Sequence, residues 1–212
     1  MTAVLRLYGF PLSTNVERVA LALAHKRVPT EIVRVDPADR SPVRAISGQD
    51  LVPVIDDGGT IVHDSTAILY HVESRYPEPP LFPSDPARRA EVGIFLDWFN
   101  RVWKRPPNVI TDELEKAEPD RALVDRMGAE IVAALARFEE MLAGRDHLMG
   151  DDFSVADCAA WPFLRFAVEW DAADPWLFHR VLNEWQAPVR EGRHPRLRAW
   201  IARVGERPTL AF

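Results

Sequence analysis

Residues 7–19 read LYGFPLSTNVERV and contain the transition that decides the fold of the first part of the chain. The pattern predicts a short strand over residues 4–8, a turn marked by Gly and Pro, and a helix over residues 15–25. Ser13 then lies at the helix N-terminus, where unpaired N–H groups and a partial positive charge favour an anion such as a thiolate. The alternative is that Ser13 or Thr14 is only an N-cap, since both residue types are favoured there.

The segments after this helix continue a mixed pattern of strands and helices. The expected elements are a half-buried strand over 31–35, a short irregular helix over 41–46, strands over 52–56 and 60–63, and a helix over 64–75. Residues 57–59, Asp-Gly-Gly, give a strong hairpin signal between the last two strands. A strand–helix–strand unit needs a parallel strand pair, whereas a short hairpin needs an antiparallel one. The order therefore predicts a small mixed sheet with packed helices, an α+β domain of thioredoxin-like layout.

A proline-dense segment, YPEPPLFP at residues 76–83, interrupts the mixed pattern and indicates a linker. After it, apolar residues recur at helical spacing, and the expected helices cover 86–103, 120–142, 175–185 and 195–204. The predicted division is a thioredoxin-like domain over 1–77, a linker over 78–85 and an all-helical, bundle-like domain over 86–212. Ser154 and Asp157 fit a capping box before an apolar run, so a structural role is expected for them.

Composition excludes several classes of function. The net charge is −6 and no run of Lys or Arg occurs, so neither nucleic acid nor an anionic membrane is an expected partner. The chain opens without a signal-peptide pattern, and no apolar run reaches membrane-spanning length. The single cysteine, Cys158, excludes an internal disulfide, is expected to be buried and inert, and fits a reducing, cytoplasmic location. The six His residues lack metal-ligand spacing, so no metal is expected.

Two further motifs have a possible chemical role. Val52-Pro53 begins an internal strand, although proline cannot donate to a sheet ladder. A cis peptide here would expose the backbone N–H and C=O of Val52 to a bound peptide, whereas the alternative is a trans proline on an edge strand. Asp64-Ser65 begins a helix, where a hydroxyl and the helix N-terminus suit a carboxylate ligand. The alternative for this pair is a plain N-cap.

The type and order of these motifs resemble the cytosolic glutathione S-transferases, and Tyr8-Gly9 followed by Ser13 is most similar to the serine-type, phi-like form. The resemblance implies that glutathione is the co-substrate and that Ser13 assists its thiolate. It implies that Val52 and Pro53 pair with the cysteinyl backbone, and that Asp64 and Ser65 hold the γ-glutamyl carboxylate. The usual Asn-Pro-x-Gly-x-Val-Pro is altered to SGQDLVP at residues 47–53, with only Val-Pro intact.

The same resemblance extends to Arg18, the electrophile and the oligomeric state. Arg18 follows Ser13 by five positions, as in the phi-like pattern, and would add positive potential near the thiolate; a solvated helix charge is the alternative. The family implies a homodimer, with a small electrophile bound mainly by the helical domain. The residues expected to contact that electrophile are Phe10, Leu12, Trp98, Arg101 and Val102.

Fold does not fix function, so three functions are left open. The first is conjugation of glutathione to small hydrophobic electrophiles. The second is a glutathione-dependent peroxidase or isomerase that uses the same thiolate. The third is a non-catalytic binding or regulatory protein, which the presence of Ser13, Val52-Pro53 and Asp64-Ser65 disfavours.

Overall fold

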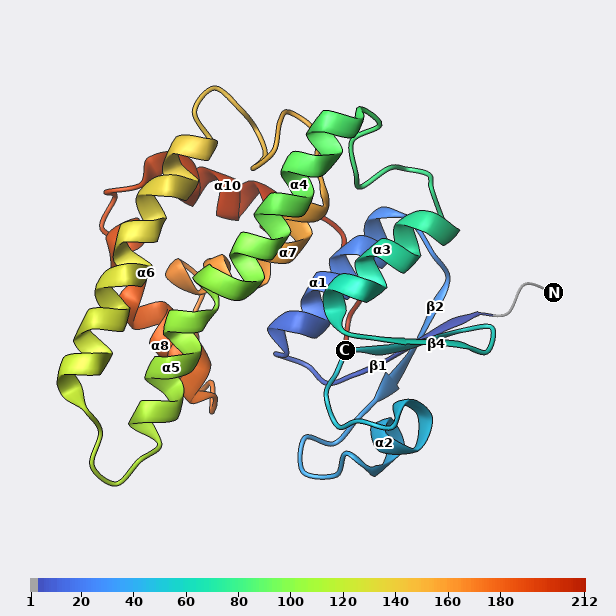
Figure 1. Ribbon diagram of the computed structural model, residues 1–212, viewed down its shortest axis with the longest axis horizontal. Coiled ribbons are helices and arrows are strands. Elements are labelled where there is room, and N and C mark those ends of the chain that lie inside the picture. Colours follow the sequence, from blue (N-terminus) through green and yellow to red (C-terminus); the bar gives the residue numbers. More distant parts are fainter. Residues whose placement is uncertain (1–3) are drawn as a thin grey trace. The chain divides into compact units, whose positions relative to one another are not determined.

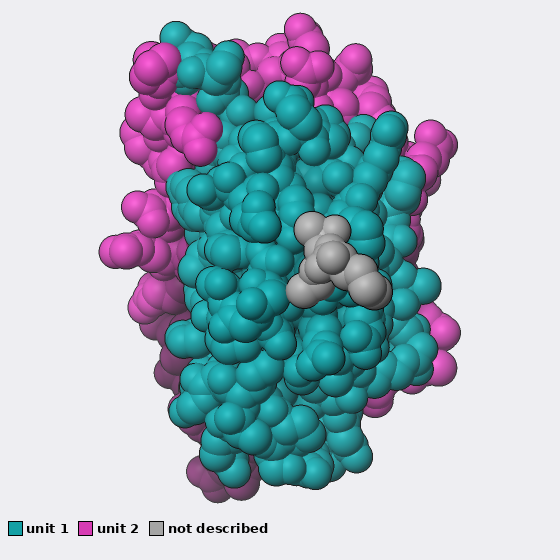
Figure 2. Space-filling view, turned by 90° about the vertical axis from the view of Figure 1, so that its right-hand side faces the viewer, with its two compact units in different colours: residues 1–85, 207–212 teal, residues 86–206 magenta. Residues whose placement is uncertain are grey.

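The computed structural model describes residues 4–212, which form two compact units (Figures 1 and 2). The first unit contains the chain up to residue 85 together with residues 207–212, and the second contains residues 86–206. The sequence pattern assigns residues 207–212 to the helical domain, whereas in the structure they pack with the first unit.

The first unit is a four-stranded mixed sheet with three helices. Its elements are β1 (Leu5–Gly9), α1 (Thr14–His25), β2 (Thr30–Arg34), α2 (Ser41–Ser47), β3 (Val54–Asp57), β4 (Thr60–His63) and α3 (Ser65–Arg75). The strand order is β2-β1-β3-β4, with β1 and β2 parallel and β3 antiparallel to both of its neighbours. The predicted thioredoxin-like layout is therefore confirmed.

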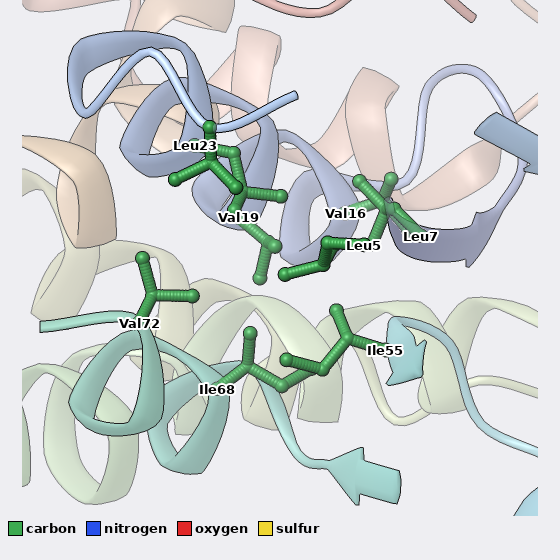
Figure 3. Packing of buried hydrophobic residues seen from close by; sticks show 9 residues of the cluster. Leu5, Leu7, Val16, Val19, Leu23, Ile55, Ile68 and Val72 are labelled. Carbon is green, nitrogen blue, oxygen red and sulfur yellow. The ribbon is translucent and has the colours of Figure 1, made fainter. Parts of the chain in front are cut away.

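The two faces of this sheet bury different side chains, because neighbouring strand residues point in opposite directions. On one face, Leu5, Leu7 and Ile55 pack with apolar residues of α1 and α3. Figure 3 shows the α1 and α3 side chains of this cluster meeting those of the strands. On the other face, Val54 packs with Val43 of α2. Apolar side chains therefore cover both faces of the sheet, so a polar site in this unit is expected at the ends of the strands.

A buried ion pair joins the end of α1 to α3, and both of its partners form hydrogen bonds to the segment after α3. Lys26 Nζ lies 2.6 Å from Glu73 Oε2, and the two side chains are 0% and 8% exposed. The same Nζ donates to carbonyl oxygens of residues 76–79 at 2.7 and 2.9 Å. Glu73 in turn accepts the backbone N–H groups of Leu81 and Phe82. Two buried charges therefore hold the linker to the first unit.

The second unit is helical throughout its regular structure. Its elements are α4 (Pro86–Trp98), the π-helical turn η1 (Phe99–Trp103), α5 (Arg105–Leu114), α6 (Arg121–Met141), α7 (Val155–Leu164), the 3₁₀ turn η2 (Arg165–Ala167), α8 (Leu177–Trp185), α9 (Ala187–Arg190) and α10 (Pro195–Gly205). The sequence pattern does not predict α5, whose first turn contains two prolines. In the first helical turn proline loses no intrahelical hydrogen bond, so Pro106 and Pro107 are compatible with a helix there. Over residues 4–212, no helix combines the length and apolarity needed to cross a bilayer.

Aromatic packing and a buried cap stabilise this second unit. Phe99 stacks on Trp103 with ring centroids 4.6 Å apart, and both rings contact Phe138 and Phe163. Ser154 and Asp157 form the predicted capping box at the start of α7. Cys158, one residue further on, is fully buried as expected.

A glycine permits the close contact between α6 and α8. A Cβ atom at Gly128 would lie only 2.2 Å from the Trp185 ring, so no larger residue fits there without a shift of the indole. Trp185 packs against the apolar cluster that contains Ile110, Met127 and Ile131. The close crossing of α6 and α8 therefore depends on the absence of a side chain at Gly128.

Candidate functional site

The strand order brings three predicted motifs to one edge of the sheet in the first unit. Because β3 is antiparallel to β1 with Tyr8 opposite Val54, the start of β3 lies beside the end of β1. The last residue of β4 is also opposite Val54. The turn that leads to Ser13, the Val52–Pro53 dipeptide and the Asp64–Ser65 dipeptide therefore all adjoin this edge.

Ser13 is the N-cap residue of α1, with extended backbone angles of φ −75° and ψ 110°. Its carbonyl oxygen accepts the N–H of Glu17 at 2.9 Å, as expected of an N-cap. Within the described part of the chain, however, its side chain makes no capping hydrogen bond. The position matches the N-cap alternative, but the hydroxyl does not act as a cap and lies beside the partly positive end of α1.

A hydrogen-bonded network connects the N-terminus of α3 to α1. Arg18 Nη1 donates to Ser65 Oγ at 3.1 Å, and Ser65 Oγ donates to Asn15 Oδ1 at 3.4 Å. Arg18 is only 1% exposed, so the alternative of a solvated helix charge is wrong. The guanidinium instead places a buried positive charge directly behind the Ser65 hydroxyl.

Two strained residues immediately precede the two candidate hydroxyls. Leu12 has φ +69° and Asp64 has φ +70°, a region that side chains other than glycine rarely adopt. Strain of this kind clusters at binding and catalytic sites, where surrounding contacts hold it in place. The Asp64 carboxylate is itself an N-cap, because its Oδ1 accepts the N–H groups of Thr66 and Ala67. The predicted contact between Asp64 and the γ-glutamyl group would therefore involve a carboxylate that already caps α3.

The Val52–Pro53 peptide bond is cis, as the sequence predicted. Val52 is half-buried and packs against the apolar clusters on both faces of the sheet. Pro53 is buried and directly precedes β3.

The predicted electrophile contacts in the first unit differ in exposure. Phe10 is buried, and the guanidinium of Arg40 lies 4.5 Å from its ring centroid. Leu12 is 38% exposed. Of these two residues, Leu12 therefore offers an open apolar surface next to Ser13, whereas Phe10 is covered.

The three predicted contacts in the second unit are only partly brought together. Trp98 and Val102 line the same hollow of about 180 Å³, between η1 and α6. Trp98 also lines a wider groove of about 420 Å³ with Arg137 and Met141. Arg101 is exposed, and its Nε lies 3.8 Å from Asp97 Oδ1.

Two residues near the site were not predicted from the sequence. Asn15 receives the Ser65 hydrogen bond, and its place in the first turn of α1 is the only signal that could have drawn attention to it. Arg40 lies in the connection from β2 to α2, where an isolated cation has no periodic pattern to mark it. Its contact with Phe10 depends on the parallel pairing of β2 with β1, which brings both strand ends to the same edge.

Comparisons with known proteins agree with the motif order. Residues 7–80 match the family model "Glutathione S-transferase, N-terminal domain", and residues 121–203 match "Glutathione S-transferase, C-terminal domain". FtsZ-localized protein A of Caulobacter vibrioides is 30% identical over 204 residues, covering 87% of this chain and 86% of the relative. Glutathione S-transferase GstB of Escherichia coli is 26% identical, covering 98% and 96%. The crystal structure of a glutathione S-transferase from Rhodospirillum rubrum F11 superimposes with a TM-score of 0.74 at 29% identity, covering 96% of this chain and 89% of that one.

Proposed function

Since this chain belongs to the glutathione S-transferase family, we propose that it binds glutathione at the edge of its sheet and conjugates it, through its sulfur, to small hydrophobic electrophiles. The Ser13 hydroxyl is the main support for this proposal. It lies at the N-terminus of α1, and within the described part of the chain it makes no capping hydrogen bond. A hydroxyl there can donate a hydrogen bond to sulfur and favour the thiolate over the thiol.

The chemistry requires the glutathione thiol to lose its proton before attack, because the thiolate is the nucleophile. The sulfur lone pair then forms a bond to the electrophilic carbon, and a leaving group departs with its electron pair or a π bond accepts the electrons. The Ser13 hydroxyl and the positive end of α1 would both stabilise the negative sulfur. The second of these effects does not depend on the side chain at position 13.

The ends of glutathione would be held by groups of opposite charge. The γ-glutamyl carboxylate suits the Ser65 hydroxyl and the N-terminus of α3, with Arg18 behind them, and its ammonium suits the Asp64 carboxylate. The backbone of Val52 would pair with the cysteinyl residue. The glycyl carboxylate suits Arg40, which lies on Phe10 beside the turn to Ser13.

The electrophile is proposed to contact apolar side chains. Leu12 next to Ser13, and Trp98 with Val102 in their shared hollow, support an apolar substrate. Phe10 and Arg101 stay candidates on the family pattern alone.

The family and the single buried cysteine support a cytoplasmic location.

Ser65→Ala is expected to weaken glutathione binding about ten- to a hundredfold, since it removes a hydrogen bond to an anion, worth roughly 1.5–3 kcal/mol. The variant also removes the Arg18–Ser65–Asn15 hydrogen bonds. Isothermal titration with glutathione would measure the dissociation constant. Thr66→Ala, one residue further along α3, is the matched control and should bind glutathione normally. An unchanged dissociation constant in a folded Ser65→Ala protein would count against this assignment.

We also propose that the protein is a homodimer. The sequence argument relied on aromatic surface in the first helices of the second unit, but Phe99 and Trp103 pack inside that unit. What supports a dimer is an exposed aliphatic side chain, Ile94 on α4, which is 70% exposed. Light scattering at micromolar concentration should give twice the mass of one chain, and Ile94→Glu should shift the protein toward monomer. A monomer mass for the unmodified protein would refute the proposal.

Two other functions compete with conjugation. A glutathione-dependent peroxidase or isomerase would use the same thiolate and would be distinguished by assays with a hydroperoxide and with an isomerisable substrate. A binding role is favoured by one specific observation, the 30% identity to a relative named for its localisation with FtsZ. Co-sedimentation with FtsZ polymers, together with absence of glutathione binding, would favour this second candidate over an enzyme.

A further inference from the structure

The last described residues run along α1 from one end of the helix to the other. Arg207 contacts His25 at the end of α1, while Phe212 lies against Gly9, close to the start of α1. A helix of 12 residues is about 18 Å long, and the five steps from 207 to 212 can span about 17 Å. Residues 207–212, here called the strap, therefore lie antiparallel to α1, and Figure 1 marks the C-terminus beside α1 and β1.

The first anchor of the strap is a histidine with two different hydrogen bonds. Arg207 Nη2 lies 3.0 Å from His25 Nδ1, and a guanidinium can only donate, so Nδ1 accepts. His25 Nε2 then carries the proton and donates to the Pro80 carbonyl oxygen at 3.3 Å. Burial lowers the pKa of His25, and the charges of Arg207 and Lys26 also lower it, against the opposing effects of the hydrogen bond to Pro80 and of the Glu73 charge. Near pH 7 the ring is therefore neutral, the form that this pair of bonds requires.

The second anchor is an aromatic ring on the turn that leads to Ser13. A Cβ atom at Gly9 would lie 3.0 Å from Phe212 Cε1 and 2.8 Å from Val16 Cγ1, so both side chains rest on the Gly9 backbone. Leu210 and Phe212 also pack against the core cluster between α1 and the sheet. Gly9 ends β1 and Val16 belongs to the first turn of α1, so these two residues flank the turn, and Phe212 and Val16 both approach Gly9.

We propose that the strap fixes the turn over residues 10–13 and that Phe212 is a positioning residue for Ser13. The consequence for catalysis rests on the proposed function, whereas the effect on the turn does not. A hydroxyl must lie within hydrogen-bond reach of sulfur, and a displacement of about 1 Å can cost up to a hundredfold in rate. Ser65 of the γ-glutamyl site lies on α3, outside the turn, although its hydroxyl donates to Asn15 at the start of α1. Loss of Phe212 should therefore lower kcat by a larger factor than it raises KM for glutathione.

The test compares three variants of the full chain. Phe212→Ala should speed amide exchange over residues 10–17 by about tenfold and lower kcat by about three- to thirtyfold. Phe212→Tyr keeps the ring and should restore both. Ile32→Ala truncates a different side chain on the same core cluster, on β2, and should lower thermal stability while leaving exchange over 10–17 and kcat close to normal.

The outcomes separate this inference from the proposed function. If Phe212→Ala and Ile32→Ala show the same exchange over residues 10–17, the strap does not position the turn and the inference is overturned. If Phe212→Ala unfolds, Phe212→Leu is the milder variant on which the same exchange is measured. An unmodified protein that neither binds nor turns over glutathione would refute the proposed function, while the exchange comparison would still decide the role of the strap.

Discussion

Ser13→Ala is expected to lower the turnover of glutathione conjugation about ten- to a thousandfold near neutral pH. The variant loses the hydroxyl that would hydrogen-bond to the thiolate, while the helix N-terminus stays and retains part of the stabilisation. Ground-state affinity for glutathione should change much less, because the ends of the molecule would be held elsewhere. Steady-state kinetics with one small aromatic electrophile would measure kcat and KM separately.

A second serine provides the matched control for this experiment. Ser13→Ala should change thermal stability little, since within the described part of the chain the Ser13 side chain makes no capping hydrogen bond. Ser154 Oγ, by contrast, accepts the Ala156 N–H at 3.3 Å and donates to Asp157 Oδ2 at 3.0 Å in the buried cap of α7. Ser154→Ala should therefore lower stability by about 1 kcal/mol and leave turnover unchanged. The opposite pattern would mean that Ser13 is the structural residue. Full activity of Ser13→Ala would direct attention to Tyr8 or Thr14.

Lys26→Met is expected to lower the free energy of unfolding by about 3–5 kcal/mol, because it leaves the Glu73 carboxylate buried without its counter-charge. The same change removes the hydrogen bonds from Nζ to the linker carbonyls. Urea denaturation at one fixed protein concentration would measure the change, since association between chains would make the apparent stability concentration-dependent.

Two comparisons test whether burial of the pair is the cause. Lys26→Met combined with Glu73→Gln removes both charges and should recover part of the loss, because no unpaired buried charge is left. The exposed pair of Arg44 with Asp50 gives the contrast, and Arg44→Met should unfold at nearly the same urea concentration as the unmodified protein. A Lys26→Met protein as stable as Arg44→Met would contradict the structural role of the pair.

The fold was largely predictable because its periodic patterns are local. Alternation and the Asp-Gly-Gly turn predicted the hairpin of β3 and β4, and the strand–helix–strand order predicted the parallel pairing of β1 with β2. The helix α5 was missed because Pro106 and Pro107 indicate a break unless they occupy the first turn. The return of residues 207–212 to the first unit depends on contacts with Gly9 and His25, which are distant in sequence.

The candidate site was predictable where a motif marks a helix start. Ser13 and Ser65 both lie at helix N-termini, and the sheet brings those ends to one edge. The buried contact of Arg18 with Ser65 and the packing of Arg40 on Phe10 could not be predicted, because each joins residues from separate elements whose side chains follow no period.

In the proposed mechanism, the first unit lowers the pKa of a bound glutathione thiol through Ser13. Ultraviolet absorbance of the thiolate, followed against pH with excess protein, measures that pKa directly. Free thiols titrate near a pKa of about 8.5, and each unit of lowering corresponds to about 1.4 kcal/mol of preferential thiolate binding. The predicted result is a pKa at least one unit lower on the unmodified protein, and a value shifted back toward 8.5, though not fully, on Ser13→Ala. An unshifted pKa on the unmodified protein, or the same lowered pKa on both proteins, would contradict the claim.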